Sequence, residues 1–290
     1  MAQVVIIGAS CAGHTVAANV KQKKPACSIT VVSRNASLPC DKRRLLEYFS
    51  GKAREKDISL CPVDFYQKND IRFLKETRVM GINPARKTVQ LKRDEKRESI
   101  GYDILVIATG METIIPEIQG SHKEGVFVFD SLKDFKAAKS SVISDTVSLT
   151  GPWNERAKAL CRFFAAEEKS IKFIGARPDD AGEFPGVEFI PSEIVEIIGE
   201  SGIQAIKFKE GKIIGTSLLV FTGPAKAATG FLTETPMKLD GDGFISLDER
   251  LMSSCKDVYA CGSVTGHAAS SWDAAAAQAS LVADVICSAI

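Results

Sequence analysis

The stretch that decides the fold lies at the N-terminus, where residues 3–13 read Gln3-Val4-Val5-Ile6-Ile7-Gly8-Ala9-Ser10-Cys11-Ala12-Gly13. A short β-branched run that ends in glycine is typical of a buried strand in a parallel sheet. We expect a helix at residues 15–22 and a second strand at residues 28–32. Together they complete a βαβ unit of about thirty residues.

The turn after the first strand has the pattern of a phosphate-binding loop. Gly8 permits the tight turn, and Gly13 lets the helix pack close to the strand. Backbone N–H groups between them face a pyrophosphate at the helix N-terminus. Ser10 stands where a middle glycine is usual, and it is small enough for close approach. A turn that holds no ligand is the alternative, but the clean βαβ unit favours a dinucleotide site.

The end of the second strand leaves two hypotheses open. An acidic residue that binds a ribose is expected there, but the sequence has Ser33-Arg34. One hypothesis is that the serine and arginine grip a 2′-phosphate, as in an NADP site. The other is that Ser33 bonds the ribose of FAD weakly, while Arg34 stacks on adenine or lies in solvent.

A second strand and turn, at residues 147–151, repeats the arrangement but continues as Pro152-Trp153-Asn154-Glu155-Arg156. Pro152 removes an N–H donor, and Trp153 fills the space that a glycine would leave for phosphate. Two alternatives follow. Either this region is a packing and docking module that no longer binds nicotinamide, or it binds NADPH with Arg156 and Arg177 as phosphate ligands.

The rest of the chain alternates strands and helices, which predicts an α/β protein with parallel sheets. Apolar and polar residues alternate within residues 71–74, 78–83 and 88–92, and charged turns separate these segments. This pattern predicts an antiparallel meander. A chain of 290 residues can form two domains.

Bulk composition excludes several partners. The net charge of +1, from 37 basic and 36 acidic residues, gives no sign of nucleic-acid or anionic-membrane binding, and the basic run at 92–97 is expected to be a solvated face. No stretch approaches the roughly 20 apolar residues of a membrane span. The first strand begins at once, which leaves no room for a signal peptide. Eight cysteines without Cys-x-x-Cys or metal spacing predict reduced thiols in a cytoplasm and no metal site.

Several segments, in order along the whole chain, carry a family resemblance. They are the first turn, residues 38–45 with 49–52, residues 61–66, residues 102–110 and residues 257–263. The chain resembles the FAD-dependent pyridine nucleotide-disulfide oxidoreductases, in the rubredoxin, ferredoxin and nitrite reductase branch. The resemblance implies two Rossmann-like three-layer domains, the second inserted in the first. Residues 1–115 and 238–290 would bind FAD, and residues 116–237 would form an NAD(P)-binding-like domain. Larger relatives continue into an interface domain where this chain ends.

The resemblance also implies roles for residues at the FAD site. The pyrophosphate would lie on the turn of Gly8, Ala9, Ser10, Cys11, Ala12 and Gly13, and the flavin nucleotide beside Ala108, Thr109 and Gly110. Gly262 and Ser263 would meet the ribityl chain and phosphate, and the backbone of Val79 would bracket adenine. Trp272 opens a helix whose N-terminus would point at the flavin pyrimidine and favour the anionic reduced form.

The chain departs from the family pattern at two flavin positions. Ser263 replaces an aspartate, so a neutral hydrogen bond stands in place of a charge-assisted one about twice as strong. Cys40-Asp41-Lys42 replaces an aromatic-x-arginine, so Lys42 would keep a charge near the flavin. Cys40 is expected to be a small packing residue, with a redox role as the alternative.

The implied function is an FAD-dependent oxidoreductase that passes electrons between a nicotinamide or protein donor and a small redox protein. The alternative is an FAD-containing relay or non-catalytic subunit of a larger complex that does not bind NAD(P)H.

Overall fold

The β-branched run at the N-terminus forms β1 (Gln3–Ile7), which pairs in parallel with β2 (Ser28–Val32) and β7 (Ile104–Ile107). β3 (Ile71–Leu74) and β18 (Val258–Ala260) extend this sheet to the order β18-β7-β1-β2-β3. The structure is a computed structural model that describes residues 1–141, 145–266 and 271–290. The chain divides into a first unit of residues 1–41, 55–112 and 226–290 and a second unit of residues 42–54 and 113–225.

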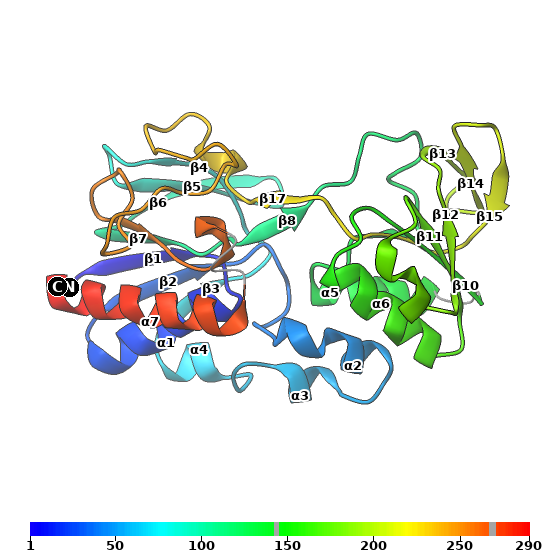
Figure 1. Cartoon of the computed structure of the whole chain (residues 1–290). Coiled ribbons are helices and arrows are strands. Elements are labelled where there is room, and N and C mark those ends of the chain that lie inside the picture. The colour runs from blue at the N-terminus through cyan, green and yellow to red at the C-terminus, as the bar shows by residue number, and fades with distance from the viewer. Residues whose placement is uncertain (142–144, 267–270) are drawn as a thin grey trace. The chain divides into compact units, whose positions relative to one another are not determined.

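Alternate residues of β1 face opposite layers of the first unit. Val4 and Ile6 pack against α1 (Cys11–Lys23) and α7 (Trp272–Ala289), whereas Val5 and Ile7 pack toward the meander. The meander consists of β4 (Arg78–Asn83), β5 (Thr88–Arg93) and β6 (Lys96–Gly101), paired antiparallel. Figure 1 shows α1 and α7 on one side of the parallel sheet and the meander on the other. The first unit therefore has three layers.

One predicted strand belongs to a different sheet. Residues 71–74 were expected in the antiparallel meander, but β3 pairs in parallel with β2, with Ile71 opposite Ile29. That prediction was wrong, because the short run carries no signal for its pairing partner. The meander takes β6 as its third strand instead. The first unit is completed by α3 (Glu55–Ile58), α4 (Phe65–Lys68), η3 (Gly230–Leu232) and η4 (Ser263–Thr265).

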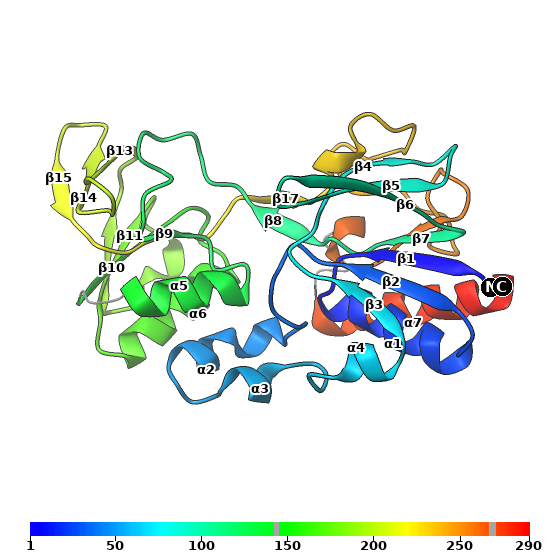
Figure 2. The same ribbon diagram turned by 180° about the vertical axis from the view of Figure 1, so that it is seen from behind.

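The second unit repeats the parallel architecture (Figure 2). Its parallel sheet has the order β12-β11-β10-β16-β9, formed by Val187–Ile190, Ser170–Ile174, Thr146–Thr150, Leu219–Phe221 and Val126–Phe127. A separate antiparallel sheet contains β13 (Ile194–Ile198), β14 (Ala205–Phe208) and β15 (Ile213–Gly215). The helices are η1 (Lys42–Arg44), α2 (Leu45–Phe49), α5 (Leu132–Ser141), α6 (Glu155–Ala166) and η2 (Asp179–Glu183). Strands β8 (Met111–Thr113) and β17 (Ala225–Ala227), where the chain passes between the units, pair with each other.

The segment 42–54 belongs to the second unit, whereas the sequence suggested the first. The ring of Phe49 lies among the rings of four other phenylalanines, at centroid distances of 5.7 to 6.2 Å: Phe129, Phe135, Phe163 and Phe164. Residues 226–237 also fall in the first unit rather than the second. The α/β class with two Rossmann-like parallel-sheet units is confirmed.

Candidate functional site

The carboxyl ends of four neighbouring strands define the candidate site of the first unit. In a parallel sheet these ends share one edge, where α/β proteins bind ligands. β18, β7, β1 and β2 are successive in the sheet, so the segments that follow them meet there. These are the cradle segments: Gly262 with Ser263, Ala108 to Gly110, Gly8 to Gly13, and Ser33 with Arg34.

The turn between β1 and α1 requires both of its glycines. Gly8 has φ of 105°, and a Cβ added to it would collide with the carbonyl of Ala108. A Cβ on Gly13 would collide with the carbonyl of Gly8. Such crowding is what brings a helix N-terminus close to a ligand. The N-cap residue Ser10 makes no side-chain capping bond, and the first turn of α1 has no acidic residue. This helix end can therefore receive an anion.

The late loop after β18 packs directly on this turn. A Cβ on Gly262 would lie 3.1 Å from the Cβ of Ala12, and one on Gly110 would lie 3.2 Å from the hydroxyl of Ser263. Sequence reasoning missed Gln278 of α7, whose side-chain oxygen accepts hydrogen bonds from Gly262 N–H at 2.9 Å and from the Thr265 hydroxyl at 3.2 Å. The sign of this role in the sequence is that Gln278 is a lone amide side chain in an alanine-rich helix. Gln278 thus fixes the shape of the late loop.

Thr109 provides a test of whether a cofactor fits here. Its hydroxyl is buried and has no hydrogen-bond partner among the described residues. Buried hydroxyl groups in native proteins almost always have a partner. The nearby glycines Gly8 and Gly110 both have positive φ, at 105° and 70°. An uncapped helix end, close-packed glycines and an unsatisfied hydroxyl fit a bound dinucleotide.

Ser33 and Arg34 are engaged by neighbouring residues. The buried Ser33 hydroxyl accepts a hydrogen bond from Asn35 N–H at 3.1 Å, and Arg34 pairs with Glu112 at 3.4 Å. Thr77 N–H donates to the Ser33 carbonyl at 2.9 Å, which ties the start of the meander to the end of β2. Val79 follows two residues later, half-buried against the meander core.

Trp272 begins α7 next to the first turn. The Cys11 thiol lies 3.9 Å from the Trp272 carbonyl, and farther along Asn19 donates to Ser280 at 3.2 Å. The two helices therefore run in the same direction, with both N-termini at the cradle. Ser271 caps α7 by accepting from Ala274 N–H at 3.2 Å, and Asp273 lies in its first turn. Part of the positive end of α7 is thus already neutralised within the helix.

The cysteines of the cradle are suited to packing. Cys11 and Cys261 are buried, and burial raises the pKa of Cys261 to about 12. A thiol with so high a pKa carries almost no thiolate at neutral pH, so it is a poor nucleophile. Burial therefore suits both residues to a packing role.

Cys40 and Lys42 lie outside the cradle segments. Cys40 is half-buried and forms an isolated bridge with Ser59. Lys42 is exposed at the start of η1, in the second unit.

The corresponding turn of the second unit is filled by aromatic packing. Trp153 makes edge-to-face contacts with Phe173, Phe184 and Phe189 at centroid distances of 4.8 to 5.1 Å. Its indole N–H donates to Asp180 at 2.8 Å. Gly151 is retained for packing, because a Cβ there would lie 2.7 Å from the carbonyl of Gly223.

The N-terminus of α6 is satisfied by its own residues. Asn154 caps the helix by accepting from Ala157 N–H at 3.0 Å, and Glu155 places an acid in the first turn. Sequence reasoning missed this capping role, although asparagine is a preferred N-cap residue. An added phosphate would have to displace the cap and approach a carboxylate.

The two arginines considered as phosphate ligands also have partners. Arg156 forms an ion pair with Asp130 at 2.8 Å and donates to the Thr113 hydroxyl at 2.9 Å. Thr113 in turn donates its own N–H to Asp130 at 2.8 Å. The guanidinium of Arg177 lies 5.7 Å from the centroid of the Phe189 ring. Both arginines therefore make contacts that stabilise the second unit.

A metal centre and a membrane-spanning helix are two other features that the described residues could form. No group of three or more histidine, cysteine or acidic side chains in the described ranges is arranged to hold a metal. Of the helices in residues 1–141, 145–266 and 271–290, none combines the length and apolarity that crossing a bilayer requires.

Known proteins resemble this chain over most of its length. It is 25% identical to apoptosis-inducing factor 3 of Mus musculus over 89% of the chain and 45% of that protein. It is 25% identical to the nitrite reductase (NADH) large subunit of Escherichia coli over 90% of the chain and 33% of that subunit. The NADH-rubredoxin oxidoreductase of Clostridium acetobutylicum is 26% identical over 90% of the chain and 68% of its own length. The chain thus spans less than half of the first two relatives.

Structural comparison gives the same fold. The structure of a covalent putidaredoxin reductase–putidaredoxin complex matches 99% of this chain and 75% of that chain with a TM-score of 0.87, at 19% sequence identity. The family model described as pyridine nucleotide-disulphide oxidoreductase matches residues 2–151 and 167–279, which is most of the sequence. The chain therefore belongs to the pyridine nucleotide-disulphide oxidoreductase family.

Proposed function

We propose that the chain is an FAD-dependent oxidoreductase that transfers electrons between a nicotinamide or protein donor and a small redox protein. The observation that carries this proposal is the uncapped N-terminus of α1, held against β1 by Gly8 and Gly13. Family membership supports FAD as the dinucleotide. The printed names of two relatives, an NADH-rubredoxin oxidoreductase and a putidaredoxin reductase bound to putidaredoxin, support a small redox protein as partner.

The residues of the first unit would hold FAD in defined places. Backbone N–H groups of the turn from Gly8 to Gly13 would bind the pyrophosphate, and Thr109 would donate or accept at the buried flavin nucleotide. Gly262 and Ser263 would meet the ribityl chain, with Gln278 holding their loop in shape. The bound isoalloxazine supplies the electron-accepting chemistry, while the protein supplies orientation and electrostatics. The roles toward FAD that the family resemblance implies for Val79, Lys42, Cys40 and Trp272 belong to the same proposal.

A second candidate function is favoured by the second turn. There Trp153 packs against three phenylalanine rings, Asn154 caps the helix and Glu155 adds a negative charge. An FAD-containing relay subunit that does not bind NAD(P)H would need no open turn there. Its electrons would come from a partner subunit, and its second unit would be a packing or docking module.

The cellular place proposed is the cytoplasm. The eight cysteines all lie among the described residues, none of them forms a disulfide there, and six are buried. Reduced cysteines without disulfides are usual in a reducing compartment.

One experiment separates the two candidates. The purified, flavin-loaded protein is mixed anaerobically with NADH or with NADPH, and the visible flavin absorption is followed. Rapid bleaching supports the nicotinamide-driven reductase and excludes the relay. A flavin that only dithionite or a reduced partner protein bleaches supports the relay. A protein that takes up no FAD refutes both.

A further inference from the structure

The outer face of the meander carries a row of three cations. In the register of the sheet, Arg78 of β4 lies opposite Lys92 of β5, and Lys92 lies opposite Arg97 of β6. Directly opposed residues on antiparallel strands have their Cβ atoms about 4.5–5.5 Å apart, and like charges placed so repel each other. The row is thus unfavourable for the isolated sheet.

Neighbouring acids compensate this row only in part. Lys92 has an ion pair with Glu95 at 3.6 Å, and the Glu95 side chain is almost fully exposed. Neither Arg78 nor Arg97 has an ion-pair partner within the part of the chain that the structure describes. Across residues 78–101 there are seven basic and three acidic side chains, although the whole chain has a net charge of only +1. The positive charge is therefore a local property of the meander segment.

The fold forces these cations outward. Val89 and Leu91 alternate with Gln90 and Lys92 along β5, and both apolar residues are fully buried in the core beneath the meander. Because successive strand residues point to opposite faces, Lys92 and its cross-strand neighbours point away from that core. A shift of one residue would bury the charges, so the register is fixed.

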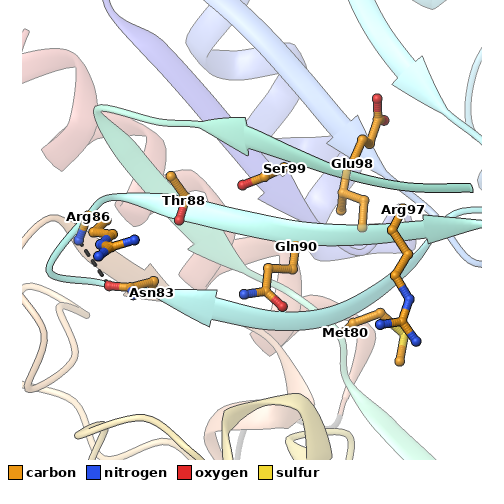
Figure 3. Close-up of a pocket in the computed structure, with 9 residues that line it drawn as sticks. Met80, Asn83, Arg86, Thr88, Gln90, Arg97, Glu98 and Ser99 are labelled. Carbon is orange, nitrogen blue, oxygen red and sulfur yellow. Dashed lines mark hydrogen bonds between the residues drawn. The ribbon is translucent and has the colours of Figure 1, made fainter.

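The same face has a hollow with an exposed apolar residue. Met80, at the bulge between Val79 and Gly81, is 45% exposed. It lines a hollow of about 510 Å³ together with Asn83, Arg86, Gln90 and Arg97. Figure 3 shows Arg97 and Met80 toward one end, Arg86 and Asn83 at the other, and Gln90 between them. Cations thus flank a methionine and two amide side chains, and Glu98, whose carboxylate pairs with Arg72 at 4.0 Å, also lines the hollow.

We propose that this meander face, made of Arg78, Met80, Arg86, Gln90, Lys92 and Arg97, is a docking surface for an acidic protein. Carboxylates of the partner would pair with the cation row and relieve its repulsion, and an apolar side chain of the partner would cover Met80. Arginine and methionine are enriched in protein–protein interfaces, whereas a phosphate site or a nucleic-acid surface does not call for an exposed methionine. The proposal does not depend on which cofactor the first unit holds.

A labelled peptide can test the charge complementarity. The probe is a fluorescein-labelled peptide of alternating glutamate and leucine, and its binding to the full chain is followed by fluorescence anisotropy. The double variant R78E/R97E is compared with K212E/K256E, which makes the same charge change at exposed lysines outside residues 78–101. The M80A variant probes the apolar contact.

The expected result is binding by the wild-type chain that weakens as NaCl rises from about 0.05 to 0.3 M. R78E/R97E should lose more than about tenfold in affinity, M80A should lose about threefold, and K212E/K256E should stay within about twofold. Denaturant unfolding of R78E/R97E should match or exceed the wild-type stability, which shows that lost binding is not lost folding.

Three results would overturn the proposal. They are no binding by the wild-type chain, an equal loss in both double variants, and binding of a DNA duplex at this face with no binding of the peptide.

Discussion

The indole N–H of Trp153 donates a hydrogen bond to the carboxylate of Asp180 across 2.8 Å. Lys158 reaches the same carboxylate at 2.6 Å, and its hydrogen bond is the main cause that holds the pKa of Asp180 below its usual value. The ring of Trp153 therefore closes the second turn, and the ionised carboxylate of Asp180 holds that ring in place. The first turn instead ends at a helix whose N-cap residue, Ser10, makes no side-chain capping bond.

Replacing Trp153 with alanine tests the structural role of the ring. We expect the free energy of unfolding of the second unit to fall by about 3 kcal/mol, because three edge-to-face contacts and the bond to Asp180 are lost. NADH binding should not appear, because Pro152 and the Asn154 cap remain. Urea unfolding and an NADH titration measure the two effects. A stability within about 0.5 kcal/mol of the wild type would contradict the account.

Replacing Gly13 with alanine tests the first turn. The added Cβ collides with the Gly8 carbonyl, so the helix must move away from the strand and the FAD affinity should fall by more than about tenfold. Gly186→Ala is the matched control, because a Cβ there meets no atom within 4 Å. Retained flavin after gel filtration gives the comparison. Equal flavin content in the two variants would count against the turn as the binding site.

Thr109→Val removes a buried hydroxyl and keeps its shape. Without FAD the variant should be as stable as the wild type or up to about 1 kcal/mol more stable, because the hydroxyl has no partner among the described residues. With FAD the affinity should fall by about fivefold to tenfold. Ser217→Ala removes another such hydroxyl in the second unit and should leave the FAD affinity unchanged. The idea fails if Thr109→Val binds FAD as tightly as the wild type.

His14 should make stability depend on pH. Burial lowers its pKa below the usual value of 6.5, and its ring nitrogen lies 3.0 Å from the Tyr66 hydroxyl. The unfolded chain therefore binds a proton at higher pH than the folded chain does. The stability that the folded chain gains from a neutral His14 is complete above pH 6.5. It is lost as pH falls through the folded pKa, by at most about 1.4 kcal/mol per pH unit.

Urea unfolding at about pH 7.5 and pH 5.5 measures this effect. His14→Gln should lose less stability than the wild type between the two values. An equal loss in both proteins would assign the pH dependence to other groups.

Local patterns predicted much of the fold. The β-branched run before Gly8 and the alanine-rich α7 have periods that identify buried strands and helices without tertiary information. β3 was misassigned because its four residues carry no information about which strand they join. The place of residues 42–54 depends on Phe49 meeting four distant rings, which no local pattern encodes.

The residues of the candidate site also divide into those that local sequence patterns predict and those that only the folded chain reveals. The glycines of the first turn follow from spacing alone, because steric crowding near a strand end leaves few residue types possible. Gln278 and Asp180 act through partners far away in sequence, so only the folded chain reveals them. The cation row of the meander also depends on which residues lie opposite one another on neighbouring strands, and a pattern within one strand does not name its partners.

The most direct measurement for the central claim is a calorimetric titration of the flavin-free protein with FAD. The account predicts that each chain takes up a single FAD, with a heat that disappears in Gly13→Ala and persists in Gly186→Ala. A protein that binds no FAD, or one whose binding is unaffected by Gly13→Ala, would contradict it.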